Sequence, residues 1–149
     1  MMTPLKSPNM NVTDDPKRDD DLVKIISFDG DGNLQLIHGY DASGFRITGS
    51  RHEGPVILLP RQTMTWKAPS DPELLTATDI VSALGTPAPP LLILGAGEAP
   101  QSPLLSLGAA LRADGINLEV MSTSAACRTW NVLMSEGRNA AACLYLTKK

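Results

Sequence analysis

The residues that could do chemistry in this chain follow two predicted strands in its second half. Gly95 and Gly97 bracket a Gly-Ala-Gly turn directly after the apolar run 91–94, and Ser122 and Thr123 follow the segment 116–121. Glycines let backbone amides approach an anion, and a helix N-terminus adds partial positive charge. Because ligands of parallel sheets bind beyond the carboxyl ends of the strands, both runs are expected at one edge.

The turn lacks the rest of a dinucleotide-binding fingerprint. That fingerprint needs a third glycine where this chain has Pro100, and the predicted helix N-cap, Ser102, comes later than its tight turn allows. NAD and FAD are not expected, and no cofactor is predicted. Two interpretations of the turn stay open: a tight strand exit selected for backbone freedom, or half of a small-anion or polar-ligand site.

The helix predicted from about residue 125 to 136 adds side chains that could complete such a site. Arg128 and Asn131 lie three apart on one face of that helix and can present hydrogen-bond donors together. The predicted ligand-binding set is Gly95, Gly97, Ser122, Thr123, Arg128 and Asn131. A second interpretation of the Arg128 and Asn131 pair is a structural clamp on neighbouring carbonyls or on Glu136.

Cys127 lies in the first turn of the same helix, where the helix dipole and Arg128 could lower the pKa of its thiol. Its alanine neighbours instead favour close packing on a sheet, and no histidine lies near it in sequence, so we expect a buried, inert thiol. Cys143, His38 and His52 form no metal-ligand spacing, and no metal is predicted. Without a catalytic constellation, the sequence leans against an enzyme and assigns no catalytic residue.

Composition limits the partners of the chain. Its 149 residues fit one domain, and 42% hydrophobic against 19% charged residues are ordinary for a globular protein. The formal net charge of -3 offers no concentrated positive field, so nucleic acid is not an expected partner. No apolar run approaches the roughly 20 residues that a membrane helix needs, so stable membrane insertion is not expected either.

Residues 1–22 differ from the remainder of the chain. They are polar, contain five aspartates and lack the apolar core of a signal peptide. We predict a disordered polar leader over 1–22 and a single α/β domain over 23–149. The lack of an export signal predicts a cytoplasmic protein.

The elements that must position the candidate residues divide into two halves. Short apolar runs at 24–28, 34–38, 44–49 and 55–60 predict an N-terminal β meander, which 63–67 extends. Strands are then predicted at 91–94, 116–121 and 140–146, and helices from Thr76 to Gly85, from Pro103 to Asp114 and from about 125 to 136. This alternation predicts an α/β fold with a mainly parallel sheet and crossover helices.

Several of these segments together resemble a known family. In order they are Gly39-Tyr40, Gly44-Phe45-Arg46, the strand 55–60, Trp66, Leu94-Gly95-Ala96-Gly97 and, most specifically, the block from Glu119 to Arg138 with Ala125-Ala126-Cys127-Arg128-Thr129-Trp130-Asn131. Over roughly residues 28–146 the chain resembles the Mth-nine-three-eight-like family, or domain of unknown function four-nine-eight. Trp130 stands where a tyrosine is usual in that family.

The resemblance implies a three-layer α/β single domain around a mixed sheet. It also implies kinship with a mitochondrial assembly factor for respiratory complex I, and it brings no established catalytic residues. Together with the missing catalytic constellation, it favours a non-catalytic protein-binding or assembly module for a respiratory or other membrane complex. The expected partner is an unidentified protein, and Trp66 is the predicted interface residue.

One alternative function stays open. The chain could be a small-molecule or anion-binding protein or enzyme that uses the Gly-Ala-Gly turn and the helix face of Arg128 and Asn131. An antiparallel edge from the meander could pair between subunits, so a monomer or a weak homodimer is expected.

Overall fold

The structure, a computed structural model, describes residues 33–98 and 104–147, and all of these except Asn33 belong to the unit Leu34–Lys149. Its strands are β4 (Ile37–Tyr40), β5 (Gly44–Ile47), β6 (Ser50–Glu53), β7 (Val56–Leu59), β8 (Gln62–Thr65), β9 (Leu91–Gly95), β10 (Asn117–Met121) and β11 (Ala140–Leu144). Its helices are η1 (Pro72–Leu74), α1 (Ala77–Leu84), α2 (Leu105–Ala113) and α3 (Thr123–Ser135). The predicted leader 1–22 and strand 24–28 lie outside the described residues.

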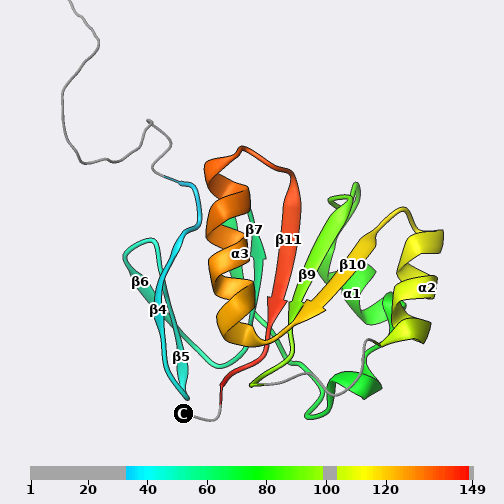
Figure 1. Cartoon of the computed structure of the whole chain (residues 1–149), viewed down its shortest axis with the longest axis horizontal. Helices are drawn as coiled ribbons and strands as arrows, with labels where there is room; N and C mark the ends of the chain where they lie inside the picture. The colour runs from blue at the N-terminus through cyan, green and yellow to red at the C-terminus, as the bar shows by residue number, and fades with distance from the viewer. Residues whose placement is uncertain (1–32, 99–103, 148–149) are drawn as a thin grey trace, which may run out of the picture. The chain divides into compact units, whose positions relative to one another are not determined.

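A five-stranded sheet in the order β10-β9-β11-β7-β8 forms the centre of this unit (Figure 1). β9 pairs in parallel with both β10 and β11, while β7 pairs antiparallel with β11 and with β8. The predicted mixed sheet is therefore confirmed, with its parallel pairs on one side and an antiparallel hairpin on the other. Residues 92–94 of β9 are all buried, which explains why that run shows no polar alternation.

Helices cover both faces of the sheet, which confirms the three-layer fold. The side chains of β11 alternate between two cores: Ala140, Ala142 and Leu144 pack with α3, whereas Ala141 and Cys143 pack with α1 and α2. The small residues of β11 let both helical layers approach this central strand closely. In Figure 1, α3 lies beside β11 and in front of β7, and α1 lies on the other side of β11, behind β10.

The predicted meander is divided between two sheets. β4, β5 and β6 form a separate antiparallel sheet, whereas β7 and β8 join the central one. β6 was not predicted, because its residues, Ser-Arg-His-Glu, are largely exposed and carry no apolar alternation. The turn before it uses positive φ at Thr48 (45°) and Gly49 (83°), which suits a tight hairpin.

The helix ends show where local signals succeed and where one fails. Thr76 caps α1 as predicted, with its Oγ1 accepting the Asp79 N–H at 3.1 Å. The predicted start of α2 at Pro103 is wrong, because the helix begins at Leu105 after Leu104 adopts left-handed angles (φ 54°, ψ 53°). Burying the Leu104 side chain gains about 1.5–3 kcal/mol, enough to offset the roughly 1–2 kcal/mol cost of that conformation. Ser102 and Pro103 lie outside the described residues.

Gly95 ends β9 where α3 crosses it closely, so a side chain there should destabilise the fold. A Cβ would lie 2.9 Å from Leu144 Cδ2, 3.0 Å from Ala126 Cβ and 3.1 Å from Thr123 Cα. Because Thr123 Cα belongs to the backbone of α3, Gly95→Ala should lower the free energy of unfolding by roughly 1–3 kcal/mol. Urea denaturation followed by circular dichroism measures the change.

Gly108 in α2 provides the matched control. A Cβ there would lie 3.9 Å from Leu118 Cδ2, an ordinary contact distance. Gly108→Ala should leave stability unchanged or raise it by up to about 1 kcal/mol, because alanine favours a helix over glycine. Equal effects of the two substitutions would contradict the close approach at Gly95.

Candidate functional site

The structure brings Gly97, Ser122 and Thr123 together where β9 and β10 end and α3 begins, as the sequence predicted. The Gly97 N–H donates to Thr123 Oγ1 at 3.0 Å, and the Thr123 N–H donates to the Gly97 carbonyl at 2.7 Å. The buried Thr123 hydroxyl in turn donates to the Tyr145 carbonyl at 2.7 Å. We call this set of contacts the Thr123 junction; it links the segments that follow β9, β10 and β11.

Five of the amides that an anion could use at the Thr123 junction, those of Ala96, Gly97, Thr123, Ala125 and Ala126, already have acceptors. The Ala96 N–H donates to the Met121 carbonyl at 2.9 Å, next to the occupied Gly97 N–H. In the first turn of α3, the Ala125 N–H donates to Ser122 Oγ at 3.2 Å and the Ala126 N–H to the Ser122 carbonyl at 2.8 Å. Of the two interpretations of the Gly-Ala-Gly turn, this geometry favours the tight strand exit, since a bound anion would have to displace Thr123.

Asn131 lies two turns further along α3 and contacts β4 rather than the turn. Its Oδ1 accepts the Ile37 N–H at 2.9 Å, and its Nδ2 donates to the Ile37 carbonyl at 2.8 Å. Beside it, Trp130 Nε1 donates to the Gln35 carbonyl at 2.7 Å. Asn131 therefore imitates the backbone of a neighbouring strand, and its hydrogen bonds match the structural-clamp interpretation.

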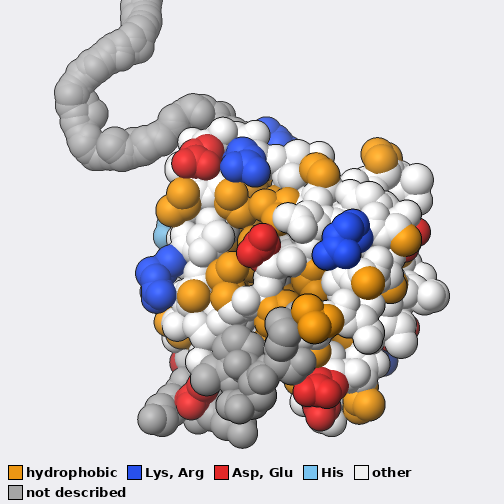
Figure 2. Space-filling model, turned by 45° about the vertical axis from the view of Figure 1, so that its right-hand side comes forward, with side chains coloured by type: hydrophobic (Ala, Val, Ile, Leu, Met, Phe, Trp, Pro, Cys, Tyr) orange, Lys and Arg blue, Asp and Glu red, His pale blue; other side chains and the backbone are white. Residues whose placement is uncertain are grey.

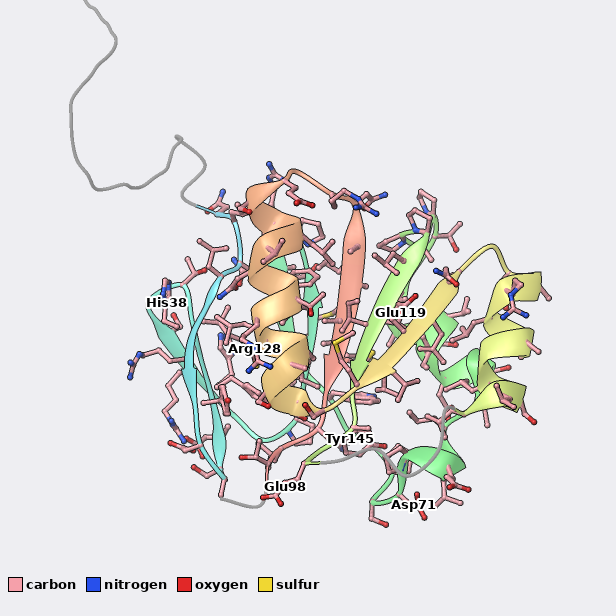
Figure 3. The ribbon with its side chains drawn as sticks, in the orientation of Figure 1. His38, Asp71, Glu98, Glu119, Arg128 and Tyr145 are labelled. Carbon is pink, nitrogen blue, oxygen red and sulfur yellow. The ribbon has the colours of Figure 1, made fainter. Side chains whose placement is uncertain are left out.

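Arg128 does not share a pocket with Asn131. Its side chain is exposed on α3, as Figure 3 shows, whereas the amide of Asn131 is turned toward β4. The alternative clamp partner, Glu136, instead lies 4.0 Å from Arg138 in an exposed ion pair. The six predicted ligand-binding residues therefore do not form one site. Gly95, Gly97, Ser122 and Thr123 lie at the junction, Asn131 binds the backbone of β4, and Arg128 is exposed.

Both cysteines are buried, as expected for inert thiols. Burial raises the pKa of Cys127 from 9.0 to about 12, and the positive charge of Arg128 opposes this shift without cancelling it. Burial also raises the pKa of Cys143 to about 12. Burial therefore keeps both thiols protonated at neutral pH, which disfavours nucleophilic and redox reactivity.

An open hollow of about 550 Å³ lies beside Trp66, on the face of the sheet that α1 and α2 cover. Its apolar lining is Ile57, Met64, Trp66, Ala68, Pro69 and Ala83, and its polar lining is Thr65, Lys67 and Asp79. The sequence singled out Trp66 but not the hollow, because α1 supplies one wall from a distant stretch of chain. We call it the Trp66 hollow.

The indole of Trp66 is anchored on Tyr145, with the ring centroids 5.1 Å apart and the planes at 67°. The Tyr145 hydroxyl is buried and has no hydrogen-bond partner among the described residues. Burial, with smaller contributions from the charges of Asp71 and Cys143, raises the pKa of Tyr145 to about 12. The anchored indole gives the hollow a rigid apolar wall.

Within residues 33–98 and 104–147, no three His, Cys, Asp or Glu side chains gather closely enough to hold a metal ion. No helix in the same part of the chain is both long and apolar enough to cross a bilayer.

The fold and these contacts define a small three-layer α/β domain. The main-chain groups of its Gly-Ala-Gly turn, the strongest candidate for a ligand site, are hydrogen-bonded within the chain. Residues 37–145 match the family described as "Protein of unknown function (DUF498/DUF598)". The chain belongs to this family, which confirms the resemblance drawn from the sequence.

Relatives and a solved structure agree with this assignment. The human protein named NADH dehydrogenase [ubiquinone] 1 alpha subcomplex assembly factor 3 is 32% identical over 108 residues, which cover 72% of this chain and 59% of the relative. An uncharacterised Rhodobacter capsulatus protein is 36% identical over 110 residues, covering 72% of this chain and 82% of its own length. A Bordetella pertussis protein described as a Mth938-like domain shares the fold with a TM-score of 0.64 at 24% identity, covering 83% and 92% of the two chains. The chain spans about three fifths of the length of the human and rat assembly-factor relatives.

Removing the Asn131 amide should destabilise the chain by releasing β4. Asn131→Ala leaves the Ile37 N–H and carbonyl without these partners, so the free energy of unfolding should fall by about 1–3 kcal/mol. Hydrogen exchange at Ile37 should also accelerate relative to β9. Arg128→Ala is the control and should change stability by less than about 0.5 kcal/mol. An Asn131→Ala variant as stable as the control would rule out the clamp.

The raised thiol pKa values predict both low reactivity and a pH dependence. At pH 8, iodoacetamide should leave Cys127 and Cys143 unmodified in the native chain while fully alkylating the denatured chain, as mass spectrometry would measure. Because the folded-state pKa of about 12 lies above the ordinary 9.0, stability is fully present below pH 9 and falls as the pH rises from 9 toward 12. Rapid native-state alkylation of Cys127 would contradict its assignment as inert.

Proposed function

We propose that this chain is a non-catalytic, protein-binding assembly module that serves a respiratory membrane complex. The observation that carries the proposal is the internal use of the candidate ligand groups: Gly97, Thr123 and Asn131 bind other parts of the fold. Relatives named as NADH dehydrogenase assembly factors support the choice of complex. The proposed location is the cytoplasm, where unpaired cysteines such as these persist.

We infer that the partner docks at the Trp66 hollow. Its lining is mainly apolar, and Trp66 already has its ring orientation set by Tyr145 before any partner arrives. A rigid aromatic wall lowers the entropy cost of binding an apolar side chain. Tryptophan is also enriched among the residues that carry most of the binding energy of interfaces. Lys67 and Asp79 at the hollow supply one charge of each sign to orient the partner.

Filling the hollow should weaken partner binding without unfolding the chain. Ala83 lines the hollow and is half-buried, so Ala83→Arg places a long cation across it. In native cells, chemical crosslinking and mass spectrometry of tagged protein should recover a subunit of an NADH dehydrogenase complex with the wild-type chain. Recovery should fall at least about tenfold with Ala83→Arg, the equivalent of about 1.4 kcal/mol.

Ser82→Arg provides the matched control, because Ser82 is exposed on α1 and does not line the hollow. It should bind as the wild type does. A deletion strain should contain less assembled NADH dehydrogenase on native gels, and the Ser82→Arg chain should restore the amount while Ala83→Arg does not. Normal complex levels in the deletion strain would overturn the assembly role. Saturable binding of a small anion that protects Gly97 and Thr123 would favour the ligand-binding alternative.

A further inference from the structure

β10 forms one edge of the central sheet among the described strands. Among the described strands it pairs only with β9. The Asn117 N–H donates to the Pro90 carbonyl at 2.8 Å, and the Met121 carbonyl accepts from the Ala96 N–H at 2.9 Å, so both residues turn their main chain toward β9. Because successive residues of a strand alternate in this respect, the amides and carbonyls of Leu118 and Val120 point away from β9. No described residue pairs with them, and such a row is a template for another strand.

The side chains along β10 define what that other strand should contain. Leu118 and Val120 are half-buried and pack with the core beneath α1 and α2. Glu119 lies between them, exposed on the opposite face of the strand, and has no ion-pair partner within the described residues (Figure 3). Figure 2 turns the side that carries β10 and α2 forward and shows apolar side chains gathered there, with acidic and basic groups among them.

A second copy of this chain fits the edge poorly. Suppose that the unpaired N–H and C=O groups of Leu118 and Val120 bond to the same groups of a second copy in an antiparallel pair. Leu118 of each copy then lies opposite Val120 of the other, and the pair is centred on Glu119. Glu119 of one copy would then face Glu119 of the other in a non-hydrogen-bonded pair, with Cβ atoms about 4.5–5.5 Å apart. Like charges directly opposite each other destabilise a sheet, whereas a lysine or arginine at that position would be attracted. The charge of Glu119 therefore selects a different, basic strand.

We propose that β10 is a docking edge for an extended segment of a partner protein, which adds to the sheet as a further antiparallel strand. The segment places a lysine or arginine opposite Glu119 and an apolar residue on each side of it, next to Leu118 and Val120. Its main chain pairs with the open groups of those two residues. This inference rests on the proposed protein-binding function and identifies a surface separate from the Trp66 hollow.

Short peptides test the docking edge directly on the full chain. The probe is the capped peptide Thr-Val-Lys-Val-Thr, titrated into isotope-labelled protein and followed by nuclear magnetic resonance, which suits weak binding. The Leu118 and Val120 amide signals should shift, and hydrogen exchange at both amides should slow. The same peptide with glutamate at its centre should bind about fivefold more weakly, and methylation of both valine nitrogens should abolish binding.

Variants of the protein separate charge selection from general attraction. Glu119→Lys should reverse the preference between the lysine and glutamate peptides, and Glu119→Gln should remove it. Glu73→Lys is the matched control, because Glu73 is exposed on η1 and the change in net charge is the same. It should keep the wild-type preference. Circular dichroism should show each variant folded.

Three outcomes would overturn the docking edge. They are equal binding of the lysine and glutamate peptides, undiminished binding of the methylated peptide, and shifts confined to β8, the opposite edge of the sheet. If the native partner still binds in an Ala83-sensitive manner under any of these outcomes, the proposed function stands and only the docking edge fails. If no partner is recovered at all, the proposed function fails whatever the peptides show.

Discussion

The hydroxyl of Thr123 is the contact on which the arrangement of this domain depends. It accepts the Gly97 N–H and donates to the Tyr145 carbonyl, so one side chain joins the exits of two parallel strands at the start of a helix. A buried hydroxyl needs such partners, because an unpaired one costs about 1–3 kcal/mol. The cost of losing either partner fixes the geometry of the Gly-Ala-Gly turn. Because the main-chain groups of this turn are used in hydrogen bonds within the fold, few of them are left to bind a ligand.

The second constraint is the attachment of the three-stranded β4-β5-β6 sheet to α3. The amide of Asn131 pairs with both main-chain groups of Ile37, and the indole of Trp130 holds the Gln35 carbonyl. Ile37, Phe45 and Ile47 also belong to one buried apolar cluster with residues of the same helix. The indole N–H of Trp130 donates to a backbone carbonyl, a hydrogen bond that a tyrosine hydroxyl can also make.

Much of the fold was predictable, because its strongest signals are local. One local physical requirement explains each of three such signals. They are the unbroken apolar run of a strand buried on both faces (β9), the Thr76 N-cap of α1 and the glycine that follows the end of α3. The polar strand β6 and the left-handed Leu104 were missed, since both are decided by tertiary contacts rather than by their own residue types. Residue pattern also placed Gly97 and Thr123 together correctly. It could not reveal that they bind each other, nor that Asn131 faces β4, because those facts depend on the distance between elements.

The position of β11 in the sheet constrains how the chain can fold during synthesis. β11 comes after all other described elements in sequence, yet it lies in the middle of the sheet between β9 and β7 (Figure 1). Until residues 140–144 leave the ribosome, the β7–β8 hairpin and the β9–β10 pair have no strand to join them, and each exposes an unpaired apolar edge. Such long-range closure is slow and leaves these edges open to aggregation. The central sheet is therefore completed only once β11, the last of the described strands in sequence, has been translated.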